Sequence, residues 1–372
     1  MNANSHGDKI TYRNGNSHLR HLGWSHHFQT EWESVGQDGW IPARVVGVRK
    51  NTFQVSNGKS EWLATAAGRI KHGADDPYPV TGDWVLVTDA VIANVLARKN
   101  ALSRGAAGAR SKQEAWPQKE QIMAANLDTV FIVCGLDRDF NLRRIERYLT
   151  LVYNCGLNPV IILTKADLHG HPDDFVDDVE SVAFGVPVHL VSALDDTGLA
   201  ALAPYLAPGQ TATMVGSSGA GKSTLVNRLY GRDVQATASV SAYGGKGRHT
   251  TTTRDLIVMP QGGMVIDNPG IREIAFWDTG EGVGNAFPEI ENLAGECRFS
   301  DCSHTHEPGC RVLQAVAEGR VSPGRLESYQ KLKRELAYLS DRQSKSADRV
   351  EKERWKNIAV KIKAMNKDRR KR

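Results

Sequence analysis

The chain has 372 residues, of which 40% are hydrophobic and 24% charged, as in a soluble protein of two or three domains. No apolar run approaches the ~20 residues of a membrane span, and no signal peptide is evident, so we expect a cytoplasmic protein without membrane contact. The net charge of +5 is uneven: residues 331–372 hold 16 Lys/Arg against 6 Asp/Glu. This favours a nucleic-acid partner, with a merely solubilising tail as the alternative.

The first part of the chain predicts an arm and a barrel. Residues 1–37 are polar and His-rich, with only Trp24, Phe28 and Trp32 as possible anchors, which predicts a flexible amino-terminal arm. Residues 38–115 begin with five short β-patterned runs, which predict a small barrel; an OB-fold is the commonest candidate and an SH3-like barrel also fits. Basic residues suited to contact with a nucleic-acid backbone decorate the last strand and the exit loop: Arg98, Lys99, Arg104, Arg110, Lys112 and Lys119.

The second part predicts an α/β domain followed by a small helical one. Over residues 116–278, apolar runs such as "DTVFIV" and "TATMVG" alternate with helical patterns, as in a parallel sheet covered on both faces. Residues 279–340 predict a small, mainly helical domain. Its last helix has apolar residues three and four apart, from Leu326 to Leu339. Residues 341–372 form a basic extension.

A phosphate loop is the strongest motif. It follows an apolar strand and precedes a helix, where its backbone N–H groups can surround phosphates. Lys222 would neutralise the β- and γ-phosphate oxygens, and Ser223 would bind Mg²⁺. The motif comprises Gly216, Ser217, Ser218, Gly219, Ala220, Gly221, Lys222, Ser223 and Thr224.

Two further loops predict that the base is guanine. The first is "TKAD": Thr164, Lys165, Ala166 and Asp167. The Asp167 carboxylate can accept hydrogen bonds from guanine N1–H and its exocyclic amine, a donor pair that adenine lacks. Ser192 and Ala193, at the end of the next strand, would offer a backbone N–H to the guanine oxygen.

Two segments after the phosphate loop have the features of nucleotide switches. In "HTTTT", Thr251 is the preferred Mg²⁺ ligand, with Thr250 and Thr252 as alternatives; His249 contributes to hydrolysis, contacts a partner or is structural. In "DNPG", Asp267 would hold Mg²⁺ through water and the Gly270 N–H would reach the γ-phosphate. Ile271 then stands where Ras-like GTPases place a water-orienting glutamine, which predicts slow basal hydrolysis.

The order of these motifs indicates a circular permutation. The base-reading loops precede the phosphate loop, whereas an ordinary GTPase has the phosphate loop first. A parallel sheet permits this rearrangement because the two pieces still pack side by side. The switches then lie immediately before the carboxy-terminal domain, so loss of the γ-phosphate could shift that domain directly.

A cluster of soft ligands predicts a structural zinc site. Cys297, Cys302, His304 and Cys310 offer three sulfurs and one imidazole, the donor set of a closed tetrahedral site. His306 is the competing ligand. Cys134 and Cys155 lie in or beside apolar stretches and are expected to be ordinary buried residues.

Through these motifs, residues 35–340 resemble the ribosome-small-subunit-dependent GTPase family (RsgA). The resemblance implies an OB-fold, a circularly permuted GTPase domain and a zinc-binding domain. It also implies GTP hydrolysis stimulated by the 30S subunit and a role in late subunit maturation. We therefore expect a monomer with GTP or GDP and Mg²⁺, one structural Zn²⁺, and the 30S subunit with its 16S rRNA as partners.

Three alternatives stay open. A permuted GTPase of the large subunit is disfavoured by the barrel and the zinc site. A P-loop kinase of small molecules is disfavoured by Asp167 and by Ser192 with Ala193. A non-catalytic, GTP-dependent rRNA-binding scaffold is kept open by Ile271.

Overall fold

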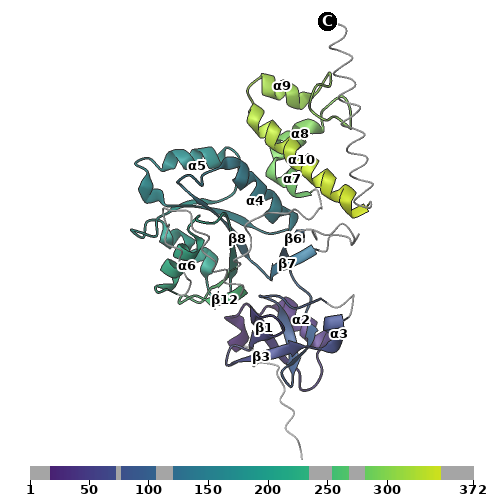
Figure 1. The fold of residues 1–372 in the computed structure, drawn as a ribbon, viewed down its shortest axis with the longest axis vertical. Helices are drawn as coiled ribbons and strands as arrows, with labels where there is room; N and C mark the ends of the chain where they lie inside the picture. The colour runs from purple at the N-terminus through teal and green to yellow at the C-terminus, as the bar shows by residue number, and fades with distance from the viewer. Residues whose placement is uncertain (1–16, 73–76, 106–119, 234–253, 268–280, 345–372) are drawn as a thin grey trace, which may run out of the picture.

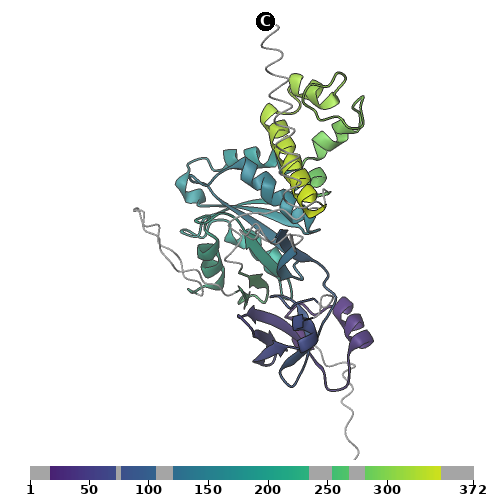
Figure 2. The same cartoon turned by 45° about the vertical axis from the view of Figure 1, so that its right-hand side comes forward.

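The computed structural model describes residues 17–72, 77–105, 120–233, 254–267 and 281–344. Along the long axis of the molecule lie a barrel, a central α/β domain and a helical domain (Figure 1). The view turned by 45° keeps the same order (Figure 2). Several groups of predicted residues fall outside the described ranges: residues 1–16 of the arm, the exit-loop residues Arg110, Lys112 and Lys119, His249 with the threonine run, Gly270 with Ile271, and the extension after Ser344.

The five predicted β runs form a closed barrel. Its strands are β1 (Ile41–Val48), β2 (Phe53–Ser56), β3 (Glu61–Ala66), β4 (Trp84–Thr88) and β5 (Val91–Val95), and the short helix α3 (Gly68–His72) follows β3. The strand order is β1-β2-β3-β5-β4, and β4 pairs back with β1. Alternate side chains such as Val45, Val55 and Val85 fill the interior. The prediction of an OB-like barrel is confirmed.

The prediction of a flexible arm is wrong for the part of it that is described. Residues 17–35 form two helices, α1 (Ser17–Arg20) and α2 (His26–Val35). Trp24 packs edge-on against Trp84 of the barrel with ring centroids 4.7 Å apart, and Phe28 is 1% exposed. The arm has too few apolar residues for a core of its own, but these residues complete a core supplied by the barrel. Its order therefore comes from tertiary contact.

A hairpin of two strands crosses the predicted boundary between barrel and α/β domain. Strands β6 (Ala101–Gly105) and β7 (Glu120–Ala125) pair antiparallel. The Gly/Ala-rich composition between the two strands predicts an exit loop and no hairpin. Leu102 and Met123 are buried in the same core as helix α4 (Leu142–Asn154), and this burial fixes the hairpin.

The central domain is the predicted parallel sheet between helices. Its strands are β8 (Thr129–Gly135), β9 (Pro159–Thr164), β10 (Val188–Val191), β11 (Thr211–Val215), β12 (Arg254–Val258) and β13 (Met264–Ile266). Besides α4, its helices are α5 (Asp173–Glu180), α6 (Lys222–Tyr230) and the 3₁₀ helices η1 (Ala166–Leu168) and η2 (Leu199–Leu206). Side chains of β8 alternate between two cores: Ile132 packs toward α4, and Phe131 packs with residues of α6 and η2. The order β10-β9-β8-β11-β13-β12 places the phosphate-loop strand inside the sheet.

Strand β12 joins this sheet to the barrel. It runs antiparallel to β13 and also pairs with β1, where Gly47 lies opposite Asp255. Within the described ranges, the barrel and the central sheet are therefore one hydrogen-bonded sheet of eleven strands. The sequence pattern did not reveal this connection.

The helical domain follows the prediction. It comprises α7 (Glu281–Ala286), α8 (Pro288–Ala294), α9 (Arg311–Ala317) and α10 (Pro323–Ser344). The apolar side of α10 is buried through Leu326, Tyr329, Leu332 and Leu336. Among the described residues, no helix has the length and apolar character needed to cross a membrane.

Candidate nucleotide site and metal centre

The phosphate loop is shaped by glycines. Gly216 has φ +151°, and a Cβ there would lie 2.2 Å from the carbonyl oxygen of Val133 on the neighbouring strand. Gly221, with φ +92°, turns the chain into α6. The Lys222 Nζ donates to the carbonyl oxygens of Gly216 and Ser217 at 2.8 and 2.6 Å. The ammonium group thus lies over the loop, at the amino end of a helix, where phosphate oxygens are favoured.

The base-reading loop meets the phosphate loop directly. Thr164, at the end of β9, donates from Oγ1 to the carbonyl oxygen of Ala220 at 2.6 Å. Lys165 has a left-handed backbone, with φ +62°, and donates from Nζ to the carbonyl oxygen of Gly219 at 2.7 Å. Two motifs more than fifty residues apart therefore form one site.

The second base-reading loop supports the first. The Ser192 hydroxyl donates to Asp167 Oδ1 at 2.7 Å and accepts from the Leu194 N–H at 3.2 Å. Ser192 is fully buried, so its position is fixed by packing. The carboxylate of Asp167 is held in place and can present its remaining lone pairs to a ligand.

Two acidic residues that the sequence analysis missed border the same site. Asp137 and Asp139 follow β8, between the two loops. The Asp137 carboxylate accepts from Lys165 Nζ at 2.6 Å, and the Asp139 carboxylate accepts from the Ser217 hydroxyl. Burial acts to raise the pKa of Asp137, but hydrogen bonds from Lys165 and from the Asp139 N–H outweigh it and hold the pKa below its ordinary value. Polar residues at the carboxyl end of a strand were the available signal.

Asp267 lies at the end of β13. Its N–H donates to the carbonyl oxygen of Asp255 at 3.0 Å. Burial raises the pKa of the Asp267 carboxyl, and the nearby positive charge of Lys222 partly offsets this effect. Because β13 runs parallel to β11, Asp267 lies at the same edge of the sheet as the phosphate loop, where a magnesium-binding carboxylate would be expected.

The predicted metal ligands converge. The donor atoms of Cys297, Cys302, His304 and Cys310 all lie within 4.8 Å of one another. The Cys297 and Cys310 sulfurs are 3.8 Å apart, and His304 Nδ1 is 3.4 Å from Cys310 Sγ. Ligand bonds of about 2.3 Å in a tetrahedron give edges of about 3.7 Å, so the spacing fits Zn²⁺. The competing His306 instead contacts the Thr305 hydroxyl at 2.9 Å on the surface.

The basic residues near the barrel are partly engaged within the protein. Arg98 forms an ion pair with buried Asp83 at 2.7 Å, and Arg104 Nε donates to Gln121 at 3.2 Å. The Lys99 ammonium lies 5.1 Å from the centre of the Phe28 ring. Arg98 was expected to contact a nucleic-acid backbone. The structure instead gives it a structural role, as the ion-pair partner of Asp83. Arg110, Lys112 and Lys119 lie outside the described residues.

Comparison with known proteins decides the family. The family model described as RsgA GTPase matches residues 95–277. The small ribosomal subunit biogenesis GTPase RsgA of Syntrophotalea carbinolica is 42% identical over 347 residues, which cover 91% of this chain and 95% of the relative. The chain belongs to the RsgA GTPase family. The RsgA of Methanosarcina acetivorans is 48% identical over 295 residues, 78% of each chain.

Solved structures agree with this membership in the RsgA family. The crystal structure of YjeQ from Thermotoga maritima matches with a TM-score of 0.59 and 29% identity, over 80% of this chain and 99% of that one. YloQ, described as a circularly permuted GTPase, shows the same fold with a TM-score of 0.56 and 23% identity, over 82% of this chain and 97% of that one. A second family model, described as a 50S ribosome-binding GTPase, matches residues 211–345, starting at the strand before the phosphate loop. As a member of the RsgA family, the chain is a GTP hydrolase with a permuted GTPase domain.

Proposed function

We propose that this GTPase binds the small (30S) ribosomal subunit through its barrel and zinc domain and assists late maturation of the subunit. It hydrolyses GTP to GDP with stimulation by the subunit and then leaves. The relatives named above are small-subunit biogenesis GTPases, and the matches cover 95% and 78% of their lengths. In this proposal it acts as a monomer in the cytoplasm, with 16S rRNA as the contacted polymer.

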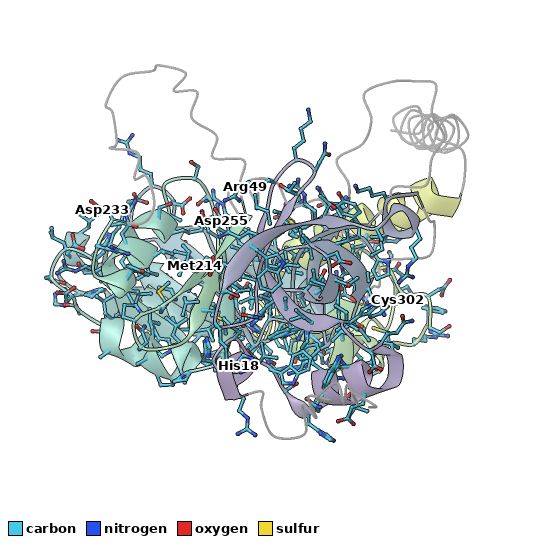
Figure 3. The ribbon with its side chains drawn as sticks, turned by 90° about the horizontal axis from the view of Figure 1, so that it is seen from below. His18, Arg49, Met214, Asp233, Asp255 and Cys302 are labelled. Carbon is cyan, nitrogen blue, oxygen red and sulfur yellow. The ribbon has the colours of Figure 1, made fainter. Side chains whose placement is uncertain are left out.

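The connection between the barrel and the switch strand carries this proposal. Strand β12 follows the threonine run and pairs with β1 of the barrel. Arg49, just after β1, forms an ion pair with Asp255 of β12 at 2.6 Å, where the two domains meet (Figure 3). Asp255 in turn accepts the N–H of Asp267. A change at the γ-phosphate would therefore be transmitted to a subunit-binding barrel through two neighbouring contacts.

The zinc domain has its own connection to the GTPase domain. Glu146 of α4 is fully buried and accepts from Arg325 of α10 at 2.7 Å. Arg325 also pairs with Glu289 of α8 at 2.7 Å. A buried network of this kind fixes orientation, so the helical domain would move with α4 rather than independently.

The proposed chemistry is positioning and charge stabilisation. Asp167 selects guanine, with Thr164, Lys165, Ala166, Ser192 and Ala193 around the base. Residues 216–224 hold the phosphates, and Lys222 neutralises charge on the β- and γ-oxygens. Ser223 and Thr251 would hold Mg²⁺, with Asp267 acting through water, and Mg²⁺ supplies charge neutralisation when bound. Cys297, Cys302, His304 and Cys310 would hold a structural Zn²⁺ that fixes the loop before α9.

The absence of a glutamine at position 271 explains the proposed dependence on the subunit. An isoleucine side chain cannot orient water, so the chain by itself would hydrolyse GTP slowly. Either His249 or a group supplied by the ribosome would complete the site. A non-catalytic scaffold would have the same isoleucine, but the hydrolase activity of the family argues against it.

The deciding experiment is GTP turnover by the full chain alone, with purified 30S subunits and with 50S subunits, at low and moderate salt. We expect 30S subunits, but not 50S subunits, to stimulate GTP turnover strongly. Equal or greater stimulation by 50S would favour a large-subunit GTPase, the class named by the second family model. Tight GTP-dependent binding to 30S without faster turnover would favour the scaffold.

A further inference from the structure

A cavity lies where the arm, the barrel and the GTPase domain meet. Its volume is about 230 Å³, and it is open on one side. Asp128 and Thr211 line it, and these residues stand at the amino ends of β8 and β11. The cavity is therefore at the opposite end of the parallel sheet from the phosphate loop, and none of the proposed nucleotide residues within the described ranges borders it.

A buried cation lines the cavity. Arg44 of β1 lines the cavity and is 1% exposed. Its guanidinium donates to the carbonyl oxygens of Gly82 and Asn126, both at 3.2 Å, to that of Leu22, and to Met264 Sδ at 3.5 Å. These contacts account for four of the five N–H groups of an arginine. Within the described part of the chain, no carboxylate forms an ion pair with Arg44.

Burial of the Arg44 guanidinium disfavours its charged form. Burial lowers the pKa of Arg44 to about 10, although the charges of Asp128 and Asp83 act to raise it. Asp83 is already paired with Arg98, and Asp128 Oδ2 accepts the N–H of Thr211 at 2.8 Å. An anion bound in the adjoining cavity, which has a volume of about 230 Å³, would pair with this buried charge and offset part of the cost of its burial.

Further groups in the cavity also favour an anion. Arg20 and Lys99 line it and are exposed to solvent. Ser25 lines it as well, and its buried hydroxyl has no hydrogen-bond partner among the described residues. Ser25 is the N-cap of α2 but makes no capping hydrogen bond, so the first N–H groups of this ten-residue helix are not capped by it. Asp128 is the one carboxylate among the described residues of the lining.

We propose that this cavity binds a phosphate group of an RNA strand, with Arg44 at its base and Arg20 and Lys99 at its mouth. The assignment to RNA rests on the proposed function. The aromatic residues of the lining, Trp24 and Phe28, are 8% and 1% exposed, so they offer little surface for stacking a base. The cavity therefore fits the backbone rather than a nucleobase, and cations at the mouth suit a polyanion that continues outward. A bound phosphate would hold the arm, the barrel and the central sheet together.

Two substitutions at one position test the cavity. Ser25→Asp places a tethered carboxylate in the cavity that Arg44 lines, whereas Ser25→Ala leaves the cavity open and removes no capping bond. Inorganic phosphate is titrated calorimetrically into full-length protein saturated with GDP and Mg²⁺, so that the phosphate loop is filled. We expect phosphate to bind the wild type and Ser25→Ala, and binding to Ser25→Asp to be at least about tenfold weaker. Equal binding by all three proteins would overturn the proposal.

The RNA assignment is tested by the salt dependence of 30S binding. One phosphate contact contributes about 0.7–0.9 to the slope of log K against log salt. Ser25→Asp and Lys99→Gln should each lower the slope by about this amount, while Ser25→Ala and the matched surface variant Lys71→Gln should not. Unchanged slopes, together with selective phosphate binding, would show that the cavity takes free phosphate and would overturn the RNA assignment. Failure of the wild type to bind 30S would instead contradict the proposed function, and the calorimetry would still decide the cavity.

Discussion

Arg49 of the barrel and Asp255 of the GTPase domain form an ion pair at 2.6 Å, although 206 residues separate them in the chain. Directly beside this pair, the backbone of β1 meets that of β12, with Gly47 opposite Asp255. A Cβ at position 47 would lie 2.8 Å from Asp255 Oδ1, so the glycine leaves room for the carboxylate. The β1–β12 backbone pairing, the glycine at position 47 and the Arg49–Asp255 ion pair thus all contribute to the junction between the barrel and the GTPase domain.

The ion pair should contribute little to stability by itself. The Arg49 and Asp255 side chains are 39% and 40% exposed, and solvent screens such pairs. In a double-mutant cycle of Arg49→Gln and Asp255→Asn, urea denaturation should give a coupling free energy of about 0.2–1 kcal/mol, which shrinks in high salt. A coupling well above this range would mean that the pair, rather than the β1–β12 backbone pairing, holds the domains together.

The buried network between α4 and α10 should matter more. Replacing Glu146 with Ala removes one of the two carboxylates that pair with buried Arg325 and should lower the free energy of unfolding by about 1.5–3 kcal/mol. The matched control is Glu335→Ala, which breaks the half-exposed Arg147–Glu335 pair between the same two helices, at 2.6 Å. That change should cost about 1 kcal/mol or less. Similar losses for the two variants in denaturant titrations would contradict the importance of burial here.

Asp167 should determine the base. An Asn side chain in its place keeps one acceptor oxygen but replaces the other with an amide donor. It can therefore no longer accept hydrogen bonds from both guanine donors, N1–H and the exocyclic amine. We expect GDP affinity to fall by about 3–6 kcal/mol, roughly 10²–10⁴-fold, and xanthosine diphosphate, which carries an oxygen in place of the exocyclic amine, to bind better than GDP. Fluorescent-nucleotide competition measures both affinities. Asp178→Asn, on the exposed side of α5, should leave them unchanged, and equal effects of the two substitutions would remove Asp167 from the site.

The metal cluster should bind one Zn²⁺ per chain. Elemental analysis of the purified protein should show this stoichiometry, and Cys302→Ser should weaken zinc affinity by more than about 100-fold. The Tm should fall with it, because the ligands tie the loop before α9 to α10 through Gln330, which donates to the His304 carbonyl oxygen at 2.6 Å. Cys155→Ser, outside the cluster, should retain full zinc. A zinc content unaffected by Cys302→Ser would exclude that residue as a ligand.

Much of the fold and of the candidate site could be predicted because local patterns encode local structure. The β8 run alternates between two cores and is buried throughout, and the helix that starts at Lys222 follows from the phosphate loop before it. The metal donors also lie close together in sequence, so a single loop can bring them together. Asp137 and Asp139 were missed because they belong to no motif, and only the place of β8 between β9 and β11 brings them to the loops.

The sequence by itself determined the five barrel strands, the permuted order of the nucleotide motifs and the ligand set of the metal site. These features depend on hydrogen bonding and burial within short segments, so they can be read directly from the order of the residues. Only the tertiary structure decided that the arm is held by Trp24 and Phe28, that Arg98 pairs with Asp83, and that β12 continues into the barrel. These features depend on which surfaces, far apart in the chain, meet in the folded protein. Such contacts are selected by the free energy of burying apolar surface, which the spacing of neighbouring residues does not reveal.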